Sequence, residues 1–302
     1  MNFKPFFLEV MDYSIIIICK NEKMNVNKTL DSILNSKNVS SYEIILINDG
    51  STDGCCNFIH DYIKCFPNIR YLYCDHLGIA GGRNLGASIA RGTNLFFLDS
   101  HISVCDFFLD GIRDTFREKN AQAVTPAVED MQSNFIGYGG TWNKDLDFTW
   151  LEKPINSGQE VPLSPGGAFA IQRTTFQLLN GFDKHFGPWG YEDQELSLRL
   201  WLFGYKIVVD SNVKIKHLFN HEHAFAMDYA SIIYNYLWMI YSHFSCKNIA
   251  KALSRFHEHP LFPLPATKVF LSRDLLNQRQ AYLTERKFDD IYFLQKFNIP
   301  FL

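Results

Sequence analysis

The chain has 302 residues and a mass of 35.0 kDa, about twice the ~150 residues of an average domain, which leaves one large α/β unit or a domain with an appendage. Its composition, 47% hydrophobic and 20% charged with 27 Phe and 14 Tyr, excludes a disordered or fibrous protein. The formal net charge of −3 and the absence of any basic run exclude a protein that binds duplex nucleic acid through a positively charged surface.

Short apolar runs alternate with helix-like segments in the first half of the chain. The four runs are SIIIIC from Ser14, YEIILIND from Tyr42, IRYLYCD from Ile69 and NLFFLDS from Asn94. This alternation predicts a nucleotide-binding type of α/β layer, whose parallel sheet is buried on both faces. In such sheets ligands bind beyond the carboxyl ends of the strands, where this sequence has the polar clusters KNE, NDGSTD and DSH. We therefore expect a cleft at that edge.

The chain after Gln122 is less regular, and its content of Gly and Pro predicts loops around a site rather than a new domain. Within this part, the apolar spacing of EDQELSLRLW predicts a helix. From about His223 onward, the segments MDYASIIYNYLWMIYSHF and FLSRDLLNQRQAYLTERKF are also predicted to be helices.

The cysteines and the N-terminal segment indicate the cellular compartment. Seven cysteines, without a pair of CxxC motifs at zinc-site spacing, predict a reducing environment. The N-terminal MNFKPFFLEVMDYS lacks the apolar core and cleavage site of a signal peptide, which favours a cytoplasmic location.

The most hydrophobic late stretch, residues 231–246, is interrupted by Asn235, Ser242 and His243. At about 16 residues it is shorter than the roughly 20 that span a bilayer, so we expect no transmembrane segment.

The NDGSTD segment directly after the second apolar run has two interpretations. In the first it is a strand-to-helix connection, with Gly50 in the turn and Ser51, Thr52 or Asp53 capping the helix that follows. In the second, Asp49 binds a ligand through a ribose hydroxyl or the N–H of a base.

Two further segments contain residue types that bind metals. In Asp99-Ser100-His101 the carboxylate and the imidazole are two residues apart, so in extended backbone they point to the same side and can hold one cation. The alternative is a surface turn with an ordinary histidine. His217 is followed by two more histidines within seven residues, which favours a metal ligand over a bystander.

The segment from Trp189 to Glu195 has three acidic residues in four positions, at the start of a predicted helix. Such acids often only complement the helix dipole and remain solvated. Next to Trp189 and Gly190, however, adjacent acids also suit a carboxylate that binds a hydroxyl and a general base.

The chain resembles the nucleotide-sugar glycosyltransferases of the GT-A fold in seven segments that occur in the expected order between residues 14 and 219. The first half is similar to the family-2 group, and the second half is similar to the polypeptide N-acetylgalactosaminyltransferases. The segments are SIIIICKNE, ILINDGSTD, GIAGGRNLGASIARG, LFFLDSH, PGGAFAIQR, WGYEDQELSLRLW and IKHLF.

The resemblance implies an α/β fold of the GT-A type, Rossmann-like, with a mostly parallel central sheet flanked by helices. It assigns residues 1–222 to this catalytic domain and leaves residues 223–302 as a C-terminal helical extension. We expect the extension, which is rich in Tyr and Trp, to pack against the catalytic layer. An acceptor platform, a dimer surface or a peripheral membrane contact are the alternatives for it.

The resemblance also implies the roles of individual residues toward a UDP-sugar donor. Glu22 and Asp49 would hold the uridine, and Arg83 would lie along the base or the diphosphate, where a guanidinium pairs with anionic oxygen. The remaining residues implied at the donor or in the sugar and acceptor cleft are Ser100, Gly166, Gly167, Trp189, Gly190 and Glu192.

A divalent cation is part of the same implication, with Asp99, His101 and His217 as its ligands. Two imidazoles, one carboxylate and open positions for diphosphate oxygens suit Mn²⁺ better than Ca²⁺ or an all-oxygen Mg²⁺ site. We therefore expect Mn²⁺, or Mg²⁺ in its place, to neutralise charge on the departing nucleoside diphosphate.

One departure from the polypeptide N-acetylgalactosaminyltransferases concerns stereochemistry. Those retaining enzymes carry Asn after the Glu of this segment, whereas this chain has Glu192 followed by Asp193, as in inverting family-2 enzymes. An inverting displacement needs a base opposite the leaving group, and Asp193 is the candidate. Retaining transfer and a non-catalytic nucleotide-sugar-binding protein are the alternatives.

The resemblance implies an acceptor hydroxyl or thiol on a peptide side chain or a glycan. The similarity of the second half to peptide-modifying enzymes favours a Ser, Thr or Cys side chain, and a glycan is the alternative. A nucleotidyltransferase on a similar layer would need a glycine-rich phosphate loop after the first strand, but KNEKMN contains no glycine.

Overall fold

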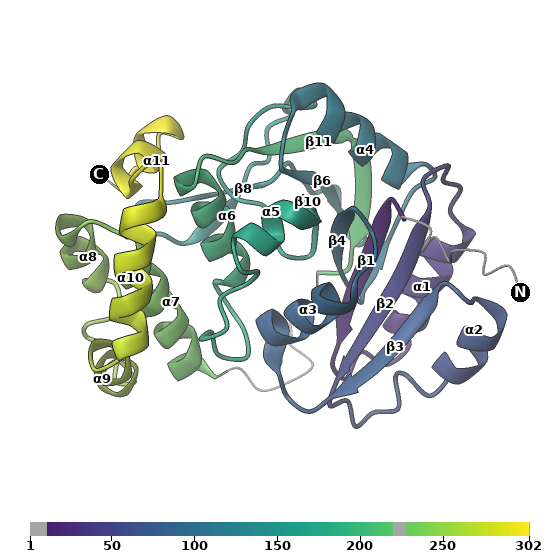
Figure 1. Cartoon of the computed structure of the whole chain (residues 1–302), viewed down its shortest axis with the longest axis horizontal. Coiled ribbons are helices and arrows are strands. Elements are labelled where there is room, and N and C mark those ends of the chain that lie inside the picture. Colours follow the sequence, from purple (N-terminus) through teal and green to yellow (C-terminus); the bar gives the residue numbers. More distant parts are fainter. Residues whose placement is uncertain (1–10, 220–227, 302) are drawn as a thin grey trace, which may run out of the picture.

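The computed structural model describes residues 11–219 and 228–301, which form a central sheet with helices on both faces (Figure 1). The four predicted strands are present and run parallel to one another in the order β3-β2-β1-β4. Their bounds are β1 (Tyr13–Cys19), β2 (Tyr42–Asp49), β3 (Ile69–Cys74) and β4 (Asn94–Asp99).

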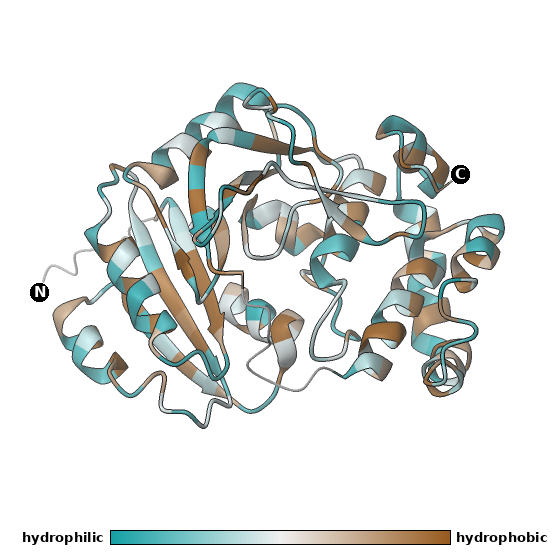
Figure 2. Ribbon diagram, turned by 180° about the vertical axis from the view of Figure 1, so that it is seen from behind, coloured by the Kyte–Doolittle hydropathy of each residue, from teal (hydrophilic) through white to brown (hydrophobic). Residues whose placement is uncertain are grey.

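Alternate residues of these strands enter two separate cores, one on each face of the sheet. In β1, Ile15 and Ile17 pack toward one face and Ile16 and Ile18 toward the other, as the two-residue period of a strand requires. This explains why the runs are apolar without interruption and why the strands are coloured mainly brown in Figure 2. The helices on the first face are α1 (Asn25–Asn35), α2 (Ile59–Cys65) and α4 (Phe108–Lys119); those on the second are α3 (Gly78–Ile89), α5 (Arg173–Leu178) and α6 (Glu192–Leu202).

The segment after Gln122 contributes further strands to the same sheet, so the expectation of loops there was wrong in part. β10 runs antiparallel between β4 and β6, and β11 runs parallel to β6. A shift of register between Asp210 and Lys214 interrupts the apolar pattern of β11, which hid this strand from the sequence. The strands of the central sheet from this segment are β6 (Ala123–Asp130), β7 (Ile136–Gly137), β10 (Ala168–Gln172) and β11 (Ile207–His217), and β5 (Ile102–Ser103), which comes earlier in the chain, pairs with β11. The remaining two strands, β8 (Gly140–Trp142) and β9 (Phe148–Trp150), form a separate two-stranded sheet.

The C-terminal helices lie at the end of the molecule opposite β3 (Figure 1). The two predicted helices correspond to α7 (Tyr229–His243) and α10 (Arg273–Glu285), and the shorter helices are α8 (Cys246–Leu253), α9 (Pro263–Phe270) and α11 (Asp290–Lys296). Within residues 11–219 and 228–301, no helix combines the length and apolarity needed to span a bilayer.

Helix α7 packs directly against the sheet-bearing part of the chain, as expected. The indole of Trp238 donates a hydrogen bond to Asp183 (2.9 Å), and Nε2 of His243 lies 2.7 Å from the carboxylate of Glu195. One continuous core includes residues of α6, α7, α10 and α11. The predicted boundary at residue 222, together with His221 and His223, falls outside the described residues, so the division into domains stays a prediction.

Truncating Trp238 to alanine is expected to lower the free energy of unfolding by about 3–5 kcal/mol, because the indole is 1% exposed and fills the junction between α7 and the sheet-bearing part. Urea denaturation followed by circular dichroism measures the loss. Tyr229→Ala in the same helix is the matched control, since Tyr229 is 60% exposed and its loss should change the stability by less than about 0.5 kcal/mol. Equal effects of the two changes would contradict a shared core.

Candidate active site

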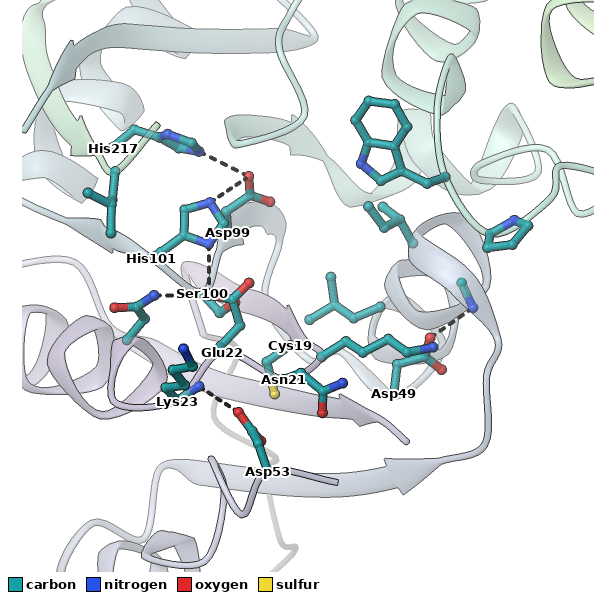
Figure 3. A pocket seen from close by; sticks show the side chains of 18 of the residues that line it. Cys19, Asn21, Glu22, Lys23, Asp49, Asp53, Asp99, Ser100, His101 and His217 are labelled. Atoms are coloured by element: carbon teal, nitrogen blue, oxygen red, sulfur yellow. Dashed lines mark hydrogen bonds and ion pairs between the residues drawn. The ribbon is translucent and has the colours of Figure 1, made fainter. Parts of the chain in front are cut away.

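A cavity of about 1030 Å³ lies beyond the carboxyl ends of β1, β2 and β4 (Figure 3). Because β2 and β4 flank β1 on opposite sides, the loops that follow β1 and β4 diverge and leave a crevice, as in other open parallel sheets. The predicted site residues that line the cavity are Glu22, Asp49, Asp99, Ser100, His101, Trp189 and His217. Those that do not are Arg83, Gly166, Gly167, Gly190, Glu192 and Asp193.

Three predicted metal ligands converge at one side of this cavity. Asp99 ends β4, His101 follows two residues later, and His217 ends β11. Nε2 of His217 lies 3.2 Å from Oδ2 of Asp99, and Nε2 of His101 lies 3.9 Å from the same oxygen. Figure 3 shows the two imidazoles and the carboxylate facing one another. The strand order of the second half thus brings together residues that are more than 110 positions apart in the chain.

The geometry of this triad fits a divalent cation. Two ligands of one ion at about 2.1 Å lie about 3.0–4.2 Å apart, and both printed separations fall in that range. Nδ1 of His101 lies 3.1 Å from Glu22, which orients the ring so that Nε2 faces Asp99. Within the described residues, the buried Nδ1 of His217 has no hydrogen-bond partner. Two nitrogens and a carboxylate oxygen are a donor set that Mn²⁺ accepts.

The electrostatics keep Asp99 in the form that a metal requires. Burial alone would favour the neutral acid, but the hydrogen bond with His217 and the nearby charges of His101 and Arg83 outweigh it. The pKa of Asp99 therefore lies well below its ordinary value, and the carboxylate is ionised.

Gly167 lies against the triad without lining the cavity. Its carbonyl accepts the backbone N–H of Asp99 at 2.9 Å. A Cβ at Gly167 would come within 3.0 Å of Oδ2 of Asp99 and 3.2 Å of Nε2 of His217. The absence of a side chain at this position therefore leaves the ligands free to approach one another.

Arg83 occupies a different place from the one expected. It is 2% exposed, and its guanidinium donates to Asp99 (3.2 Å), to Glu192 (3.2 Å) and to the carbonyl of Gly166 (2.6 Å). Gly82 and Gly86 allow α3 to lie closely against β1, since a Cβ at either would come within 2.6 Å of an isoleucine side chain. This close packing places Arg83 behind the cavity wall, where it joins the metal triad to the acidic start of α6.

Replacing Arg83 with lysine tests this position. Nη1 of Arg83 reaches Glu192 while Nη2 reaches Asp99 and Gly166, and the single ammonium of lysine lacks this planar fork. We therefore expect the free energy of unfolding to fall by about 3 kcal/mol even without donor and metal. Urea denaturation measures it, with Arg117→Lys on the exposed face of α4 as the control that should cost almost nothing. If Arg83 were only a ligand of the diphosphate, the substitution would leave the stability unchanged and would weaken only donor binding.

Glu192 and Asp193 begin α6 beside Gly166; neither lines the cavity, but Asp193 is partly exposed whereas Glu192 is buried. The carboxylate of Glu192 accepts from Arg83 and from the N–H of Gly190, whereas that of Asp193 accepts from the N–H groups of Gly166 (2.8 Å) and Gln194 (2.8 Å). Burial, followed by the charge of Asp193, raises the pKa of Glu192 to about 7. Burial also raises the pKa of Asp193, which makes it a stronger base than an exposed carboxylate.

The NDGSTD segment forms the turn of the first interpretation, with Gly50 at a φ of +72°, and ligand binding by Asp49 stays a prediction. Asp49 lines the cavity, and its two oxygens accept the N–H groups of Leu77 (2.6 Å) and Gly78 (3.0 Å), which fixes the start of α3. The predicted capping of the next helix was wrong, because α2 begins after Phe58 without a side-chain cap.

The residues after Asp49 instead bind the loop that follows β1. Asn21 donates its N–H to Ser51 and accepts the N–H of Thr52, while Asp53 accepts the N–H of Lys23. The KNE and NDGSTD loops therefore form one hydrogen-bonded wall of the cavity, as Figure 3 shows for Lys23 and Asp53.

Asn235 of α7 is a supporting residue that the sequence did not predict. Its buried amide donates to the carbonyls of Trp189 (3.1 Å) and Gly190 (2.9 Å) and accepts the N–H of Gly187 (2.7 Å). Gly190 has a φ of +100°, a conformation that glycine adopts without strain. A C-terminal helix thus holds the loop that carries Trp189 at the cavity.

Comparison with known proteins places the chain in a family. Residues 14–184 match the model described as glycosyl transferase family 2, and residues 159–224 match the N-terminal domain of galactosyltransferase. Polypeptide N-acetylgalactosaminyltransferase 8 of Drosophila melanogaster is 31% identical over 223 residues, which cover 68% of this chain and 38% of that protein. Polypeptide N-acetylgalactosaminyltransferase 16 of Homo sapiens is 28% identical over 233 residues, 70% of this chain and 41% of that protein. The chain thus spans about two fifths of the length of these relatives.

Two solved structures share the fold. The crystal structure of GalNAc-T7 with UDP, GalNAc and Mn²⁺ superposes with a TM-score of 0.77 at 18% identity, covering 96% of this chain and 57% of that one. The mannosyltransferase PcManGT from Pyrobaculum calidifontis in complex with GDP-Man and Mn²⁺ has a TM-score of 0.54 at 15% identity, covering 91% of this chain and 74% of that one. The predicted GT-A fold is confirmed. Since its family model covers more than half of the 302 residues, the chain belongs to glycosyl transferase family 2.

Proposed function

We propose that this chain is a metal-dependent glycosyltransferase that moves a sugar from a UDP-sugar to a hydroxyl or thiol of an acceptor. The observation that carries the proposal is the convergence of Asp99, His101 and His217 at the side of the 1030 Å³ cavity. Family membership supports the reaction class, and the Mn²⁺ and UDP in the GalNAc-T7 structure support the cofactor and the nucleotide.

The donor nucleotide fits the wall formed by the loops after β1 and β2. We assign Glu22 and Asp49 to the uridine, since both line the cavity. Oδ1 of Asp49 accepts from the N–H of Leu77 and the thiol of Cys74, whereas Oδ2 accepts only the N–H of Gly78 and so retains a lone pair for a ribose hydroxyl. Ser100, which lies between Asp99 and His101 in the chain, and Trp189 line the same cavity, where the diphosphate and the sugar would lie.

The chemistry divides between the metal triad and the acids of α6. Asp99, His101 and His217 would hold Mn²⁺, which would supply positive charge against the departing diphosphate. Asp193 takes the proton of the acceptor in an inverting displacement, and its raised pKa supports that role. Glu192 holds Arg83 and Gly190 in place. Retaining transfer remains the competing mechanism, because the curated relatives are polypeptide N-acetylgalactosaminyltransferases.

For the acceptor we propose a Ser, Thr or Cys side chain of a peptide ahead of a glycan, on the basis of those relatives. We also propose a reducing, cytoplasmic environment, since all seven cysteines are free thiols. Incubation with peptide arrays and with free glycans, each with labelled donor, separates the two classes of acceptor.

A panel of nucleotide sugars, with Mn²⁺ or with a chelator, tests the donor. We expect at least one UDP-sugar to raise the melting temperature and to be hydrolysed slowly, in each case only with Mn²⁺, whereas GDP-mannose has neither effect. Binding without hydrolysis or transfer would favour a non-catalytic nucleotide-sugar-binding protein. If no nucleotide sugar stabilised the protein or was hydrolysed, the proposed function would be wrong.

A further inference from the structure

Three buried cysteines from two neighbouring strands and their loops converge next to the cavity. Cys19 ends β1, and Cys55 and Cys56 follow the NDGSTD loop. None of the three is more than 6% exposed. The Sγ atoms of Cys19 and Cys56 are 3.4 Å apart, those of Cys55 and Cys56 are 3.8 Å apart, and all three sulfurs lie within 4.8 Å of one another.

This spacing is that of ligands around one cation. Sulfurs bound tetrahedrally to Zn²⁺ at about 2.3 Å lie about 3.8 Å from one another. The two printed separations lie within about 0.4 Å of that value. Thiolates select thiophilic ions, whereas the nitrogen and oxygen ligands of the Asp99 triad accept Mn²⁺, so the two sites differ in chemistry.

We propose that Cys19, Cys55 and Cys56 form a three-thiolate site for a thiophilic divalent cation such as Zn²⁺. A smaller cavity of about 200 Å³ adjoins it, lined by Cys55 and Cys56 together with His60 and Tyr71. This cavity leaves room for a fourth ligand, either water or a small solute.

In the proposed site the cation connects the KNE loop after β1 to the NDGSTD loop after β2, which together form one wall of the large cavity. Lys20, Asn21 and Glu22 follow Cys19 directly, and Asp53 precedes Cys55 by two residues; all four line the large cavity. An ion on the three sulfurs therefore holds both loops from behind. We expect the donor to bind more tightly when the cation is present. This expectation rests on the proposed function, whereas the cation site itself does not.

Cobalt titration tests the site directly. The metal-free protein, kept reduced with a phosphine, is titrated with Co²⁺, whose thiolate complexes absorb strongly in the near ultraviolet by charge transfer. We expect this absorption to saturate at one equivalent and to disappear on addition of one equivalent of Zn²⁺. The wild type alone is decisive, because the absence of the absorption in folded protein would overturn the proposal.

Variants assign the absorption to the cluster. Cys56→Ser should remove at least nine tenths of it, and Cys55→Ala is the second variant if the first does not fold by circular dichroism. Cys65→Ser, an exposed cysteine of α2, is the matched control and should leave it unchanged. Asp99→Ala should also leave it unchanged, since that triad contains no sulfur. Absorption that survived in folded Cys56→Ser and Cys55→Ala would refute the site.

Discussion

Replacing His217 with alanine should abolish the Mn²⁺ dependence of donor hydrolysis and lower its rate at least about a hundredfold. The change removes one of three ligands, and the loss of several kcal/mol of charge stabilisation corresponds to factors of that size. Titration of Mn²⁺ followed by electron paramagnetic resonance, together with a hydrolysis assay, measures both effects. Among the three ligands His217 is the cleanest choice, because Asp99 also pairs with the buried Arg83.

Matched variants separate ligand loss from general damage. Asp99→Ala should abolish Mn²⁺ binding as well, but should also lower stability, because it removes one acceptor of the Arg83 guanidinium. His257→Ala removes an imidazole that is 55% exposed and should change neither Mn²⁺ binding nor hydrolysis. Mn²⁺ binding that survived in both His217→Ala and Asp99→Ala would refute the assigned ligands.

The first half of the fold was predictable because burial on both faces leaves a simple pattern. β1, β2 and β4 are short apolar runs without interruption, and the polar residues after them form the cavity. The second half was not predictable in the same way. β10 has only five residues, and a shift of register interrupts β11, so long-range pairing rather than local pattern defines both strands.

The same distinction between local pattern and long-range packing applies to the residues of the site. Asp99 and His101 share one short segment, and His217 lies in a motif of the family, so their convergence was expected. The place of Arg83 depends on how closely α3 approaches β1, which no spacing reveals. The sequence did contain a signal for Asn235, because a polar residue inside an apolar helix indicates a buried hydrogen-bonding role. The cysteine cluster has no sequence motif, because adjacent strands bring together residues 36 and 37 positions apart.

Asp193→Asn should lower the rate of transfer by about 10²–10⁴-fold while the protein still binds UDP and Mn²⁺. An amide cannot take the acceptor proton, and that range is typical for the loss of a general base. The amide oxygen can keep only one of the two backbone hydrogen bonds, from Gly166 or from Gln194, without rearrangement. Thermal stabilisation by UDP and Mn²⁺ therefore accompanies the assay, and its survival shows that the donor cavity is intact.

The pH profile and the product give independent tests of the same residue. A base must be ionised, and burial raises the pKa of both Glu192, to about 7, and Asp193, so kcat/KM should rise with pH through the apparent pKa of this pair and level off above it. Asp193→Glu should retain part of the activity, whereas the asparagine variant should not. Nuclear magnetic resonance of the product should show an anomeric configuration opposite to that of the donor. Retention of configuration, or near-normal turnover by Asp193→Asn, would contradict inversion with Asp193 as the base.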